Sequence, residues 1–192
     1  MTDIDVARGE DFVVVGTAKE NIEMLKGKRI LIVDDEPDVL ETLIELLDMC
    51  YIDTAPNFAT AAKLLDKNTY DIAILDIMGV NGYELLQRTR KKGVPAIMLT
   101  AHALSAENLV RSIREGADSY VPKDKMADIH TFVAEVVRDR EKGIRRHKTW
   151  FKRLKPYFDM KFGPNWQEKD QAFWRDFNQS VTATASEVQD ML

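Results

Sequence analysis

Residues 28–39 read KRILIVDDEPDV and give the clearest indication of the fold. Four consecutive apolar residues, Ile30 to Val33, predict a short strand covered on both faces, as the strands of parallel sheets are. Asp34 and Asp35 follow directly, and after Glu36, Pro37 opens a segment whose apolar residues recur every three or four positions, the spacing of a helix. A strand that passes through an acidic turn into a helix is typical of an α/β fold with a parallel sheet.

The same alternation of apolar runs and helically spaced segments continues to about residue 142. We expect strands near residues 29–34, 51–55, 71–76, 95–100 and 118–121, and helices near 37–49, 57–67, 81–92, 105–115 and 125–142. Residues 1–27 are expected to form an N-terminal arm. One alternative gives this arm a short strand at 12–15 and a short helix at 17–26, and the other leaves it partly ordered.

Polar side chains stand where four of the expected strands end. Asp34 and Asp35 follow the first strand, Asp76 the third, Thr100 closes the fourth, and Lys123 lies just past the fifth. Ligands of open parallel sheets bind at this edge. Three carboxylates there repel one another, which a hard divalent cation such as Mg²⁺ relieves, and a carboxylate can accept a phosphoryl group as an acyl phosphate. The simpler alternative is a helix cap, a turn aspartate, a strand threonine and a surface lysine.

Five stretches together carry a resemblance to a known family: KRILIVDDEPDV (28–39), YDIAILDI (70–77), NGYELLQ (81–87), VPAIMLTAH (94–102) and GADSYVPK (116–123). Over about residues 28–142 the chain resembles the receiver domain of two-component response regulators. The resemblance implies a flavodoxin-like, doubly wound five-stranded parallel sheet in the strand order 2-1-3-4-5. We expect a receiver domain at 28–142, followed by an α-helical C-terminal extension at 143–192.

The resemblance also implies a role for individual residues. Asp76 would be the phosphoacceptor, and Asp34, Asp35 and Asp76 would bind Mg²⁺ together with the backbone carbonyl of Met78. Thr100 would contact the phosphoryl group.

Two further residues complete the set that the resemblance implies. Lys123 would contact the phosphoryl group with Thr100, and Tyr120 matches the aromatic residue that switches with Thr100. The donor would be a histidine kinase or a phosphotransfer protein. The chain would then be a phosphoacceptor signalling protein that assists its own phosphotransfer and dephosphorylation, rather than an enzyme.

The sequence departs from the family pattern at two places beside this site. The loop at 77–81, between Asp76 and Gly82, is shorter than usual, so it should be tighter, and Met78 stays a ligand only if the gap falls after it. Asp124 follows Lys123 where the family has a proline joined by a cis bond. A cis bond to a non-proline residue costs about 3–4 kcal/mol. We therefore expect a trans bond between Lys123 and Asp124 and a different path for the loop.

The C-terminal part differs in charge and in aromatic content. The net charge of −5 combines 24 acidic and 15 basic residues in 1–137, a net of −9, with 8 acidic and 12 basic residues in 138–192, a net of +4. Nine of the sixteen aromatic residues lie between Trp150 and Phe177. A heptad-like stripe runs from Val133 to Phe158, with the helix expected to end near Leu154 because Pro156 follows. A second helix is expected after Asn165.

Several roles for this extension are open. The aromatic residues must pack on one another, on the receiver, or in a dimer interface, because so many cannot all stay exposed. The basic segment 138–155 is the basis for the alternative function of a DNA-binding transcriptional regulator. Association with a membrane surface and a catalytic output are weaker alternatives.

Composition excludes other classes of protein. No apolar run approaches the ~20 residues of a membrane span, and because the N-terminus is acidic and lacks a long apolar core, we expect no signal peptide. The single cysteine, Cys50, cannot form an internal disulfide, which is typical of a reducing compartment. We expect a cytoplasmic protein without a membrane span.

Overall fold

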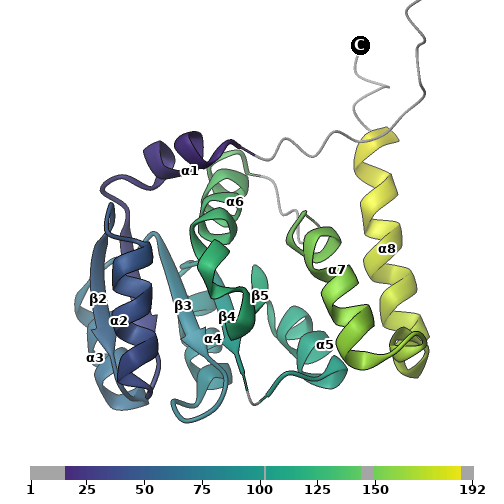
Figure 1. Cartoon of the computed structure of the whole chain (residues 1–192), viewed down its shortest axis with the longest axis horizontal. Helices are drawn as coiled ribbons and strands as arrows, with labels where there is room; N and C mark the ends of the chain where they lie inside the picture. Colours follow the sequence, from purple (N-terminus) through teal and green to yellow (C-terminus); the bar gives the residue numbers. More distant parts are fainter. Residues whose placement is uncertain (1–15, 102, 144–148, 187–192) are drawn as a thin grey trace, which may run out of the picture.

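A five-stranded parallel sheet organises the chain (Figure 1). The computed structural model describes residues 16–101, 103–143 and 149–186, with side chains described as far as residue 178. The strands are β1 (Arg29–Val33), β2 (Tyr51–Ala55), β3 (Ile72–Asp76), β4 (Ala96–Thr100) and β5 (Ser119–Pro122). They pair in the order β2-β1-β3-β4-β5, so the predicted fold and strand order are confirmed.

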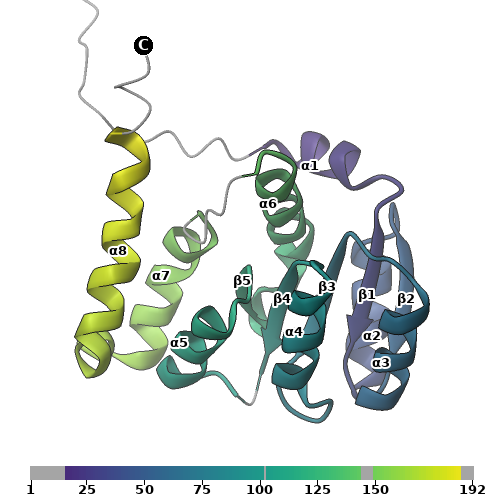
Figure 2. The ribbon, with the colours of Figure 1, turned by 180° about the vertical axis from the view of Figure 1, so that it is seen from behind.

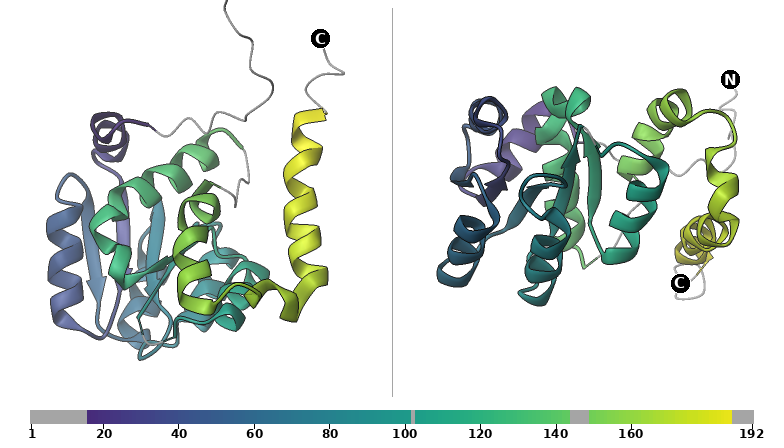
Figure 3. Two further views of the ribbon diagram at one scale, coloured as in Figure 1. Left: turned by 45° about the vertical axis from the view of Figure 1, so that its right-hand side comes forward. Right: turned by 90° about the horizontal axis from the view of Figure 1, so that it is seen from below.

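Five helices cover the two faces of the sheet, as Figure 3 shows from below. They are α2 (Pro37–Leu46), α3 (Phe58–Lys67), α4 (Gly82–Lys91), α5 (Ala106–Glu115) and α6 (Ile129–Glu141). Helices α2 and α6 contact each other on one face, and α3, α4 and α5 follow one another on the other. Every residue of β3 and β4 is buried, as double-sided cover requires.

A short helix, α1 (Ala18–Leu25), precedes the sheet and packs on α6. It begins with a capping box, in which the Thr17 hydroxyl accepts from the Glu20 backbone N–H and the Glu20 carboxylate accepts from the Thr17 N–H. Arg138 of α6 donates to Asn21 at 2.9 Å. The helix expected at 17–26 is present, whereas the strand expected at 12–15 lies outside the described residues.

Three helical segments follow α6 and lie beyond β5, at one end of the sheet (Figures 1 and 2). They are α7 (Thr149–Phe162), the short 3₁₀ helix η2 (Trp166–Asp170) and α8 (Gln171–Ser186), and we call them together the appendage. Helix α7 contacts β5 and α6, and therefore covers the edge strand β5, which would otherwise present unpaired backbone groups. The described helices include none long and apolar enough to cross a membrane.

Two expectations for this part of the chain were wrong. The stripe from Val133 to Phe158 does not follow one helix, because α6 ends at Glu141 and Gly143 then adopts a left-handed φ of 65°. Helix α7 does not end near Leu154 but continues through Pro156 to residue 162. A proline inside a helix costs about 3 kcal/mol. Leu154 and Phe158, on either side of it, are both buried in the same core, and this packing outweighs the local cost.

The aromatic residues of the appendage pack on one another. Phe151 lies at their centre, with its ring centroid 5.1 Å from that of Trp174 and 5.2 Å from that of Phe177. Phe158 extends the cluster to the sheet, because its ring centroid lies 6.1 Å from that of Tyr120 on β5. Of the alternatives open from sequence, the aromatic residues therefore use both mutual packing and packing on the receiver.

Candidate functional site

Two buried carboxylates meet at the carboxyl edge of the sheet. Asp76 is the last residue of β3, and Asp34 follows β1, the strand beside it. Val33 and Leu75 are register partners, so the next residue of each strand points into the same edge. Asp34 is fully buried and Asp76 is 5% exposed. Burial raises the pKa of both carboxyls, that of Asp76 to about 6, so each needs a compensating positive charge when ionised.

The ammonium of Lys123 supplies that charge. Its Nζ lies 2.8 Å from Asp34 Oδ2 and 3.1 Å from Asp76 Oδ1. Burial alone would lower the pKa of Lys123, but its carboxylate partners outweigh that effect and raise the pKa, so the side chain stays charged. A third carboxylate, Glu36, lies 2.7 Å from the same nitrogen. We did not expect this role for Glu36, although its place directly after Asp34 and Asp35 was a signal.

A buried hydroxyl lies at the end of the next strand. Thr100 closes β4, and its side chain is 1% exposed. Its Oγ1 makes no well-formed hydrogen bond within the described part of the chain. The Thr100 side chain interacts with the Tyr120 hydroxyl and lowers its pKa, but without a well-formed hydrogen bond its hydroxyl can still donate to a ligand at the carboxyl edge. Tyr120, on the neighbouring strand β5, is also fully buried, and its hydroxyl donates to the backbone carbonyl of Ala103 at 3.2 Å.

The loop after Asp76 is tight, as its shortness predicted. The Val80 N–H donates to the Met78 carbonyl and closes a three-residue turn around Gly79, whose φ is 55°. The carboxylate of Asp35 lies directly against this glycine, where any β-carbon would overlap it. Asp35 is solvent-exposed, in contrast to Asp34 and Asp76. The Met78 carbonyl thus already accepts one hydrogen bond, which leaves one lone pair for a ligand.

The carboxylates fit Mg²⁺ in kind, because hard cations prefer carboxylate and carbonyl oxygens. Their geometry is different: among the described residues, no three His, Cys, Asp or Glu side chains are placed so that they could bind one metal ion together. The ammonium of Lys123 lies against Asp34 and Asp76 instead, and partly neutralises them. Binding of a cation here therefore requires Lys123 to give up part of these contacts.

The peptide bond after Lys123 is trans, as the sequence predicted. The other peptide bonds of the described residues are trans as well, and the chain turns into the 3₁₀ helix η1 (Lys123–Asp128). The Asp124 carboxylate accepts a hydrogen bond of 2.7 Å from the Tyr157 hydroxyl, and Lys161 Nζ lies 3.6 Å from it. The residue that replaces the family's proline is thus bound by α7.

The fold and this site define a class of protein: a doubly wound parallel α/β domain with buried carboxylates, a lysine and a buried hydroxyl at one edge. A family model described as the response regulator receiver domain matches residues 30–134, more than half of the chain. The chain belongs to this family, whose members are signalling proteins of two-component systems.

Individual relatives cover the same part of the chain. The Heme response regulator HssR of Staphylococcus aureus (strain Newman) is 40% identical over 99 residues, which are 48% of this chain and 43% of that protein. A CheY-like receiver domain protein from Methanospirillum hungatei superposes with a TM-score of 0.57 at 30% identity, over 62% of this chain and 99% of that structure. A putative response regulator from Chloroflexus aurantiacus gives 0.53 at 28% identity, over 59% and 99%. The chain thus spans less than half the length of the curated relatives it matches.

Proposed function

We propose that this chain accepts a phosphoryl group on Asp76 and signals through protein–protein interaction. The donor is a histidine kinase or a phosphotransfer protein, and the reaction requires Mg²⁺. The observation that carries the proposal is the buried Asp76 carboxylate, bound by the Lys123 ammonium at the edge where the buried hydroxyl of Thr100 also lies. Residues 28–142 form the receiver in this proposal, and residues 143–192 form a helical appendage.

The chemistry is an in-line displacement at phosphorus. An oxygen of Asp76 forms a new O–P bond while the P–N bond of the donor phosphohistidine breaks. The electron pair of the broken bond stays on the imidazole nitrogen, and the ring leaves neutral because its other nitrogen carries a proton. Lys123 and Thr100 bind the phosphoryl oxygens through the ammonium and the hydroxyl. When bound, Mg²⁺ neutralises phosphoryl charge, and Asp34, Asp35, Asp76 and the Met78 carbonyl would hold it.

Incubation of the full chain with a small acyl phosphate donor tests this proposal. We expect a Mg²⁺-dependent gain in mass of one phosphoryl group, which peptide mapping places on Asp76. No such gain, or a gain on another residue, overturns the proposed function.

The contact between Gly79 and Asp35 leads to a prediction about the cation. Gly79→Ala places a methyl group where the Asp35 carboxylate lies and strains a left-handed residue, so it should displace Asp35. We expect Mg²⁺ affinity, measured by calorimetric titration, to fall about tenfold, which corresponds to ~1.4 kcal/mol. Gly163→Ala is the matched control, because Gly163 also has a positive φ but has open space around it. Equal affinities of the two variants would contradict the assignment of Asp35.

The buried hydroxyl of Thr100 gives a second prediction. Thr100→Val removes a buried hydroxyl that makes no well-formed hydrogen bond, so the unmodified protein should keep its stability within about 1 kcal/mol. Phosphorylation should slow about a hundredfold, because a donor to the phosphoryl oxygens is lost. Thr89→Val should behave oppositely: the Thr89 hydroxyl donates to the Leu86 carbonyl at 2.9 Å, so its loss should destabilise by about 1 kcal/mol and leave the rate unchanged. Parallel behaviour of the two variants in thermal melts and rate assays would contradict this role.

The alternative of DNA binding through segment 138–155 has less support. Among its described side chains, Arg138 contacts Asn21, Arg140 donates to the Gly93 carbonyl, and Arg153 pairs with Glu135. Residues 144–148 of the segment lie outside the described residues. The contacts within the chain supply no observation that favours a nucleic acid, so we advance only the phosphoacceptor function.

A further inference from the structure

A cleft lies between helix α5 of the receiver and the appendage, two parts that Figure 3 shows side by side. Its volume is about 360 Å³, within the range of about 300–1,000 Å³ that is usual for small-molecule sites. Val110 of α5 and the indoles of Trp166 and Trp174 give the cleft an apolar wall. The described residues that line it include none of the carboxylates of the candidate site or Lys123.

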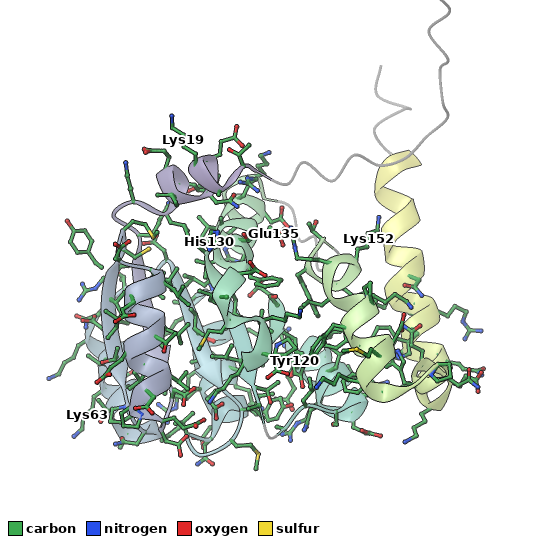
Figure 4. All side chains as sticks on the ribbon, in the orientation of Figure 1. Lys19, Lys63, Tyr120, His130, Glu135 and Lys152 are labelled. Atoms are coloured by element: carbon green, nitrogen blue, oxygen red, sulfur yellow. The ribbon has the colours of Figure 1, made fainter. Side chains whose placement is uncertain are left out.

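The indole wall is held rigidly by the aromatic core of the appendage. The rings of Trp166 and Trp174 are nearly perpendicular, with centroids 4.9 Å apart, and Trp174 stacks on Phe151 at 5.1 Å. The same core packs on Tyr120 of the sheet through Phe158 (Figure 4). Both indoles are at least 95% buried, so only a small part of each ring faces the cleft. The wall therefore exists without a ligand, and it suits a further aromatic ring in a stacked or edge-to-face arrangement.

The charged side chains of the cleft neutralise one another. They form three ion pairs: Arg111 with Glu115, Arg114 with Asp170, and Lys169 with Glu107. Because each cation already has a carboxylate partner, a charged ligand would lose hydration without gaining an unpaired counter-charge. The lining therefore favours an uncharged ligand.

Two of these ion pairs cross from α5 to the appendage and limit the size of the ligand. Arg114 Nη2 lies 2.8 Å from Asp170 Oδ2, and Lys169 Nζ lies 3.3 Å from Glu107 Oε1. Glu107 and Arg114 are seven residues apart on α5, which is about 10 Å along the helix, and Val110 lies between them. A docked helix is about 10–12 Å wide with its side chains and would have to break both pairs, whereas a small molecule fits between them.

We propose that this cleft binds a small, uncharged, planar aromatic molecule, with its ring against Val110 and the two indoles. Such a ligand contacts α5 and the appendage together, so it binds only while the appendage is docked on the receiver. By mass action it therefore stabilises the docked form. The proposal does not depend on phosphorylation of Asp76.

Three naphthalene probes that share a ring system and differ in charge test the ligand class. They are 2-naphthalenemethanol, which is uncharged, 2-naphthoate, which is an anion, and 2-naphthylmethylammonium, which is a cation. Each is titrated into the full chain and followed by calorimetry. We expect the uncharged probe to bind with a Kd of about 1 mM or lower, and both charged probes to bind at least about tenfold more weakly.

The tryptophans report where the probe binds. The chain has three, Trp150, Trp166 and Trp174, and all lie in the appendage, but only the last two are among the described residues that line the cleft. The indole N–H signals of Trp166 and Trp174 in NMR spectra should therefore shift when the probe binds. The signal of Trp150 should stay in place and serves as an internal reference.

Substitutions that fill the cleft test the site itself. Val110→Phe places a ring between the two crossing ion pairs and should weaken binding of the uncharged probe at least about tenfold. Ala106→Leu fills the same cleft from the start of α5 with a smaller change, and it keeps the test valid if Val110→Phe unfolds early. Ala172→Leu is the matched control, because Ala172 is exposed on α8 and does not line the cleft. It should bind the probe as the unaltered chain does.

Each other result has a definite meaning. Absence of binding by all three probes overturns the proposal, and a charged probe that binds as tightly as the uncharged one overturns the ligand class. Equal affinities of Ala106→Leu and Ala172→Leu overturn the site. If the affinity for the probe falls as the protein concentration rises, and sedimentation shows a larger species, a second copy of the chain occupies the cleft and the proposal is wrong.

Discussion

Asp76→Asn is expected to reduce Mg²⁺-dependent phosphorylation by at least about a thousandfold, the scale on which removal of a nucleophile acts. An amide oxygen is a poor nucleophile and carries no charge to attract a cation. Asp76 lies at the end of β3 against the Lys123 ammonium, and β3 has no other carboxylate that could accept the phosphoryl group in its place. Mass measurement of the modified fraction over time, with a small acyl phosphate donor, gives the rate.

The variant should fold, which makes the result interpretable. Burial raises the pKa of Asp76 to about 6. At pH 7 the ionised carboxylate therefore lowers the stability of the folded protein, and a neutral amide avoids this cost. Lys123 keeps Asp34 and Glu36 as partners. The melting temperature should therefore stay the same or rise. Asp53→Asn, on β2, removes a carboxylate away from the site and should phosphorylate at the normal rate. Modification that persists in Asp76→Asn would refute the assignment.

The sequence predicted the fold, and also which residues come together at the carboxyl edge of the sheet, for the same physical reason. Parallel strands buried on both faces leave apolar runs, and their carboxyl ends converge, so the residue after each run is placed by the strand order alone. Asp34, Asp76, Thr100 and Lys123 could therefore be found without coordinates. Their pairing could not be predicted, because which oxygen Lys123 contacts depends on side-chain geometry. Glu36 was missed for that reason.

The appendage was less predictable because long-range packing decides its shape. Pro156 carries a strong local signal to end a helix, yet burial of Leu154 and Phe158 carries α7 through it. Asp124 finds its partner Tyr157 33 residues later, and no local pattern specifies such a contact. The spacing from Val133 to Phe158 suited one helix as well as two, so it could not locate the break after Glu141.

Phe158→Ala should detach the appendage while the sheet stays folded. Phe158 is fully buried, and its ring lies 5.5 Å from that of Phe162, 6.2 Å from that of Trp166 and 6.1 Å from that of Tyr120, measured between centroids. Truncation of a buried phenylalanine to alanine costs about 3–5 kcal/mol. Urea unfolding followed by tryptophan emission reports on the appendage, and its midpoint should fall by roughly 2 M. Circular dichroism reports on the whole chain. It should still show a second unfolding transition at higher urea concentration, which belongs to the sheet.

Met160→Ala is the matched control, two residues further along α7, because its side chain is 70% exposed. A substitution at such a site changes stability by about 0.5 kcal/mol or less, so its emission midpoint should match that of the unaltered chain. A loss below about 1 kcal/mol in Phe158→Ala would mean that the appendage does not depend on its contact with β5. Simultaneous loss of both transitions would mean that receiver and appendage form one cooperative unit. Two separated transitions are expected, because the main contacts of α7 with the receiver are to β5 and α6, at one edge of the sheet, whereas α2 to α5 cover the other strands.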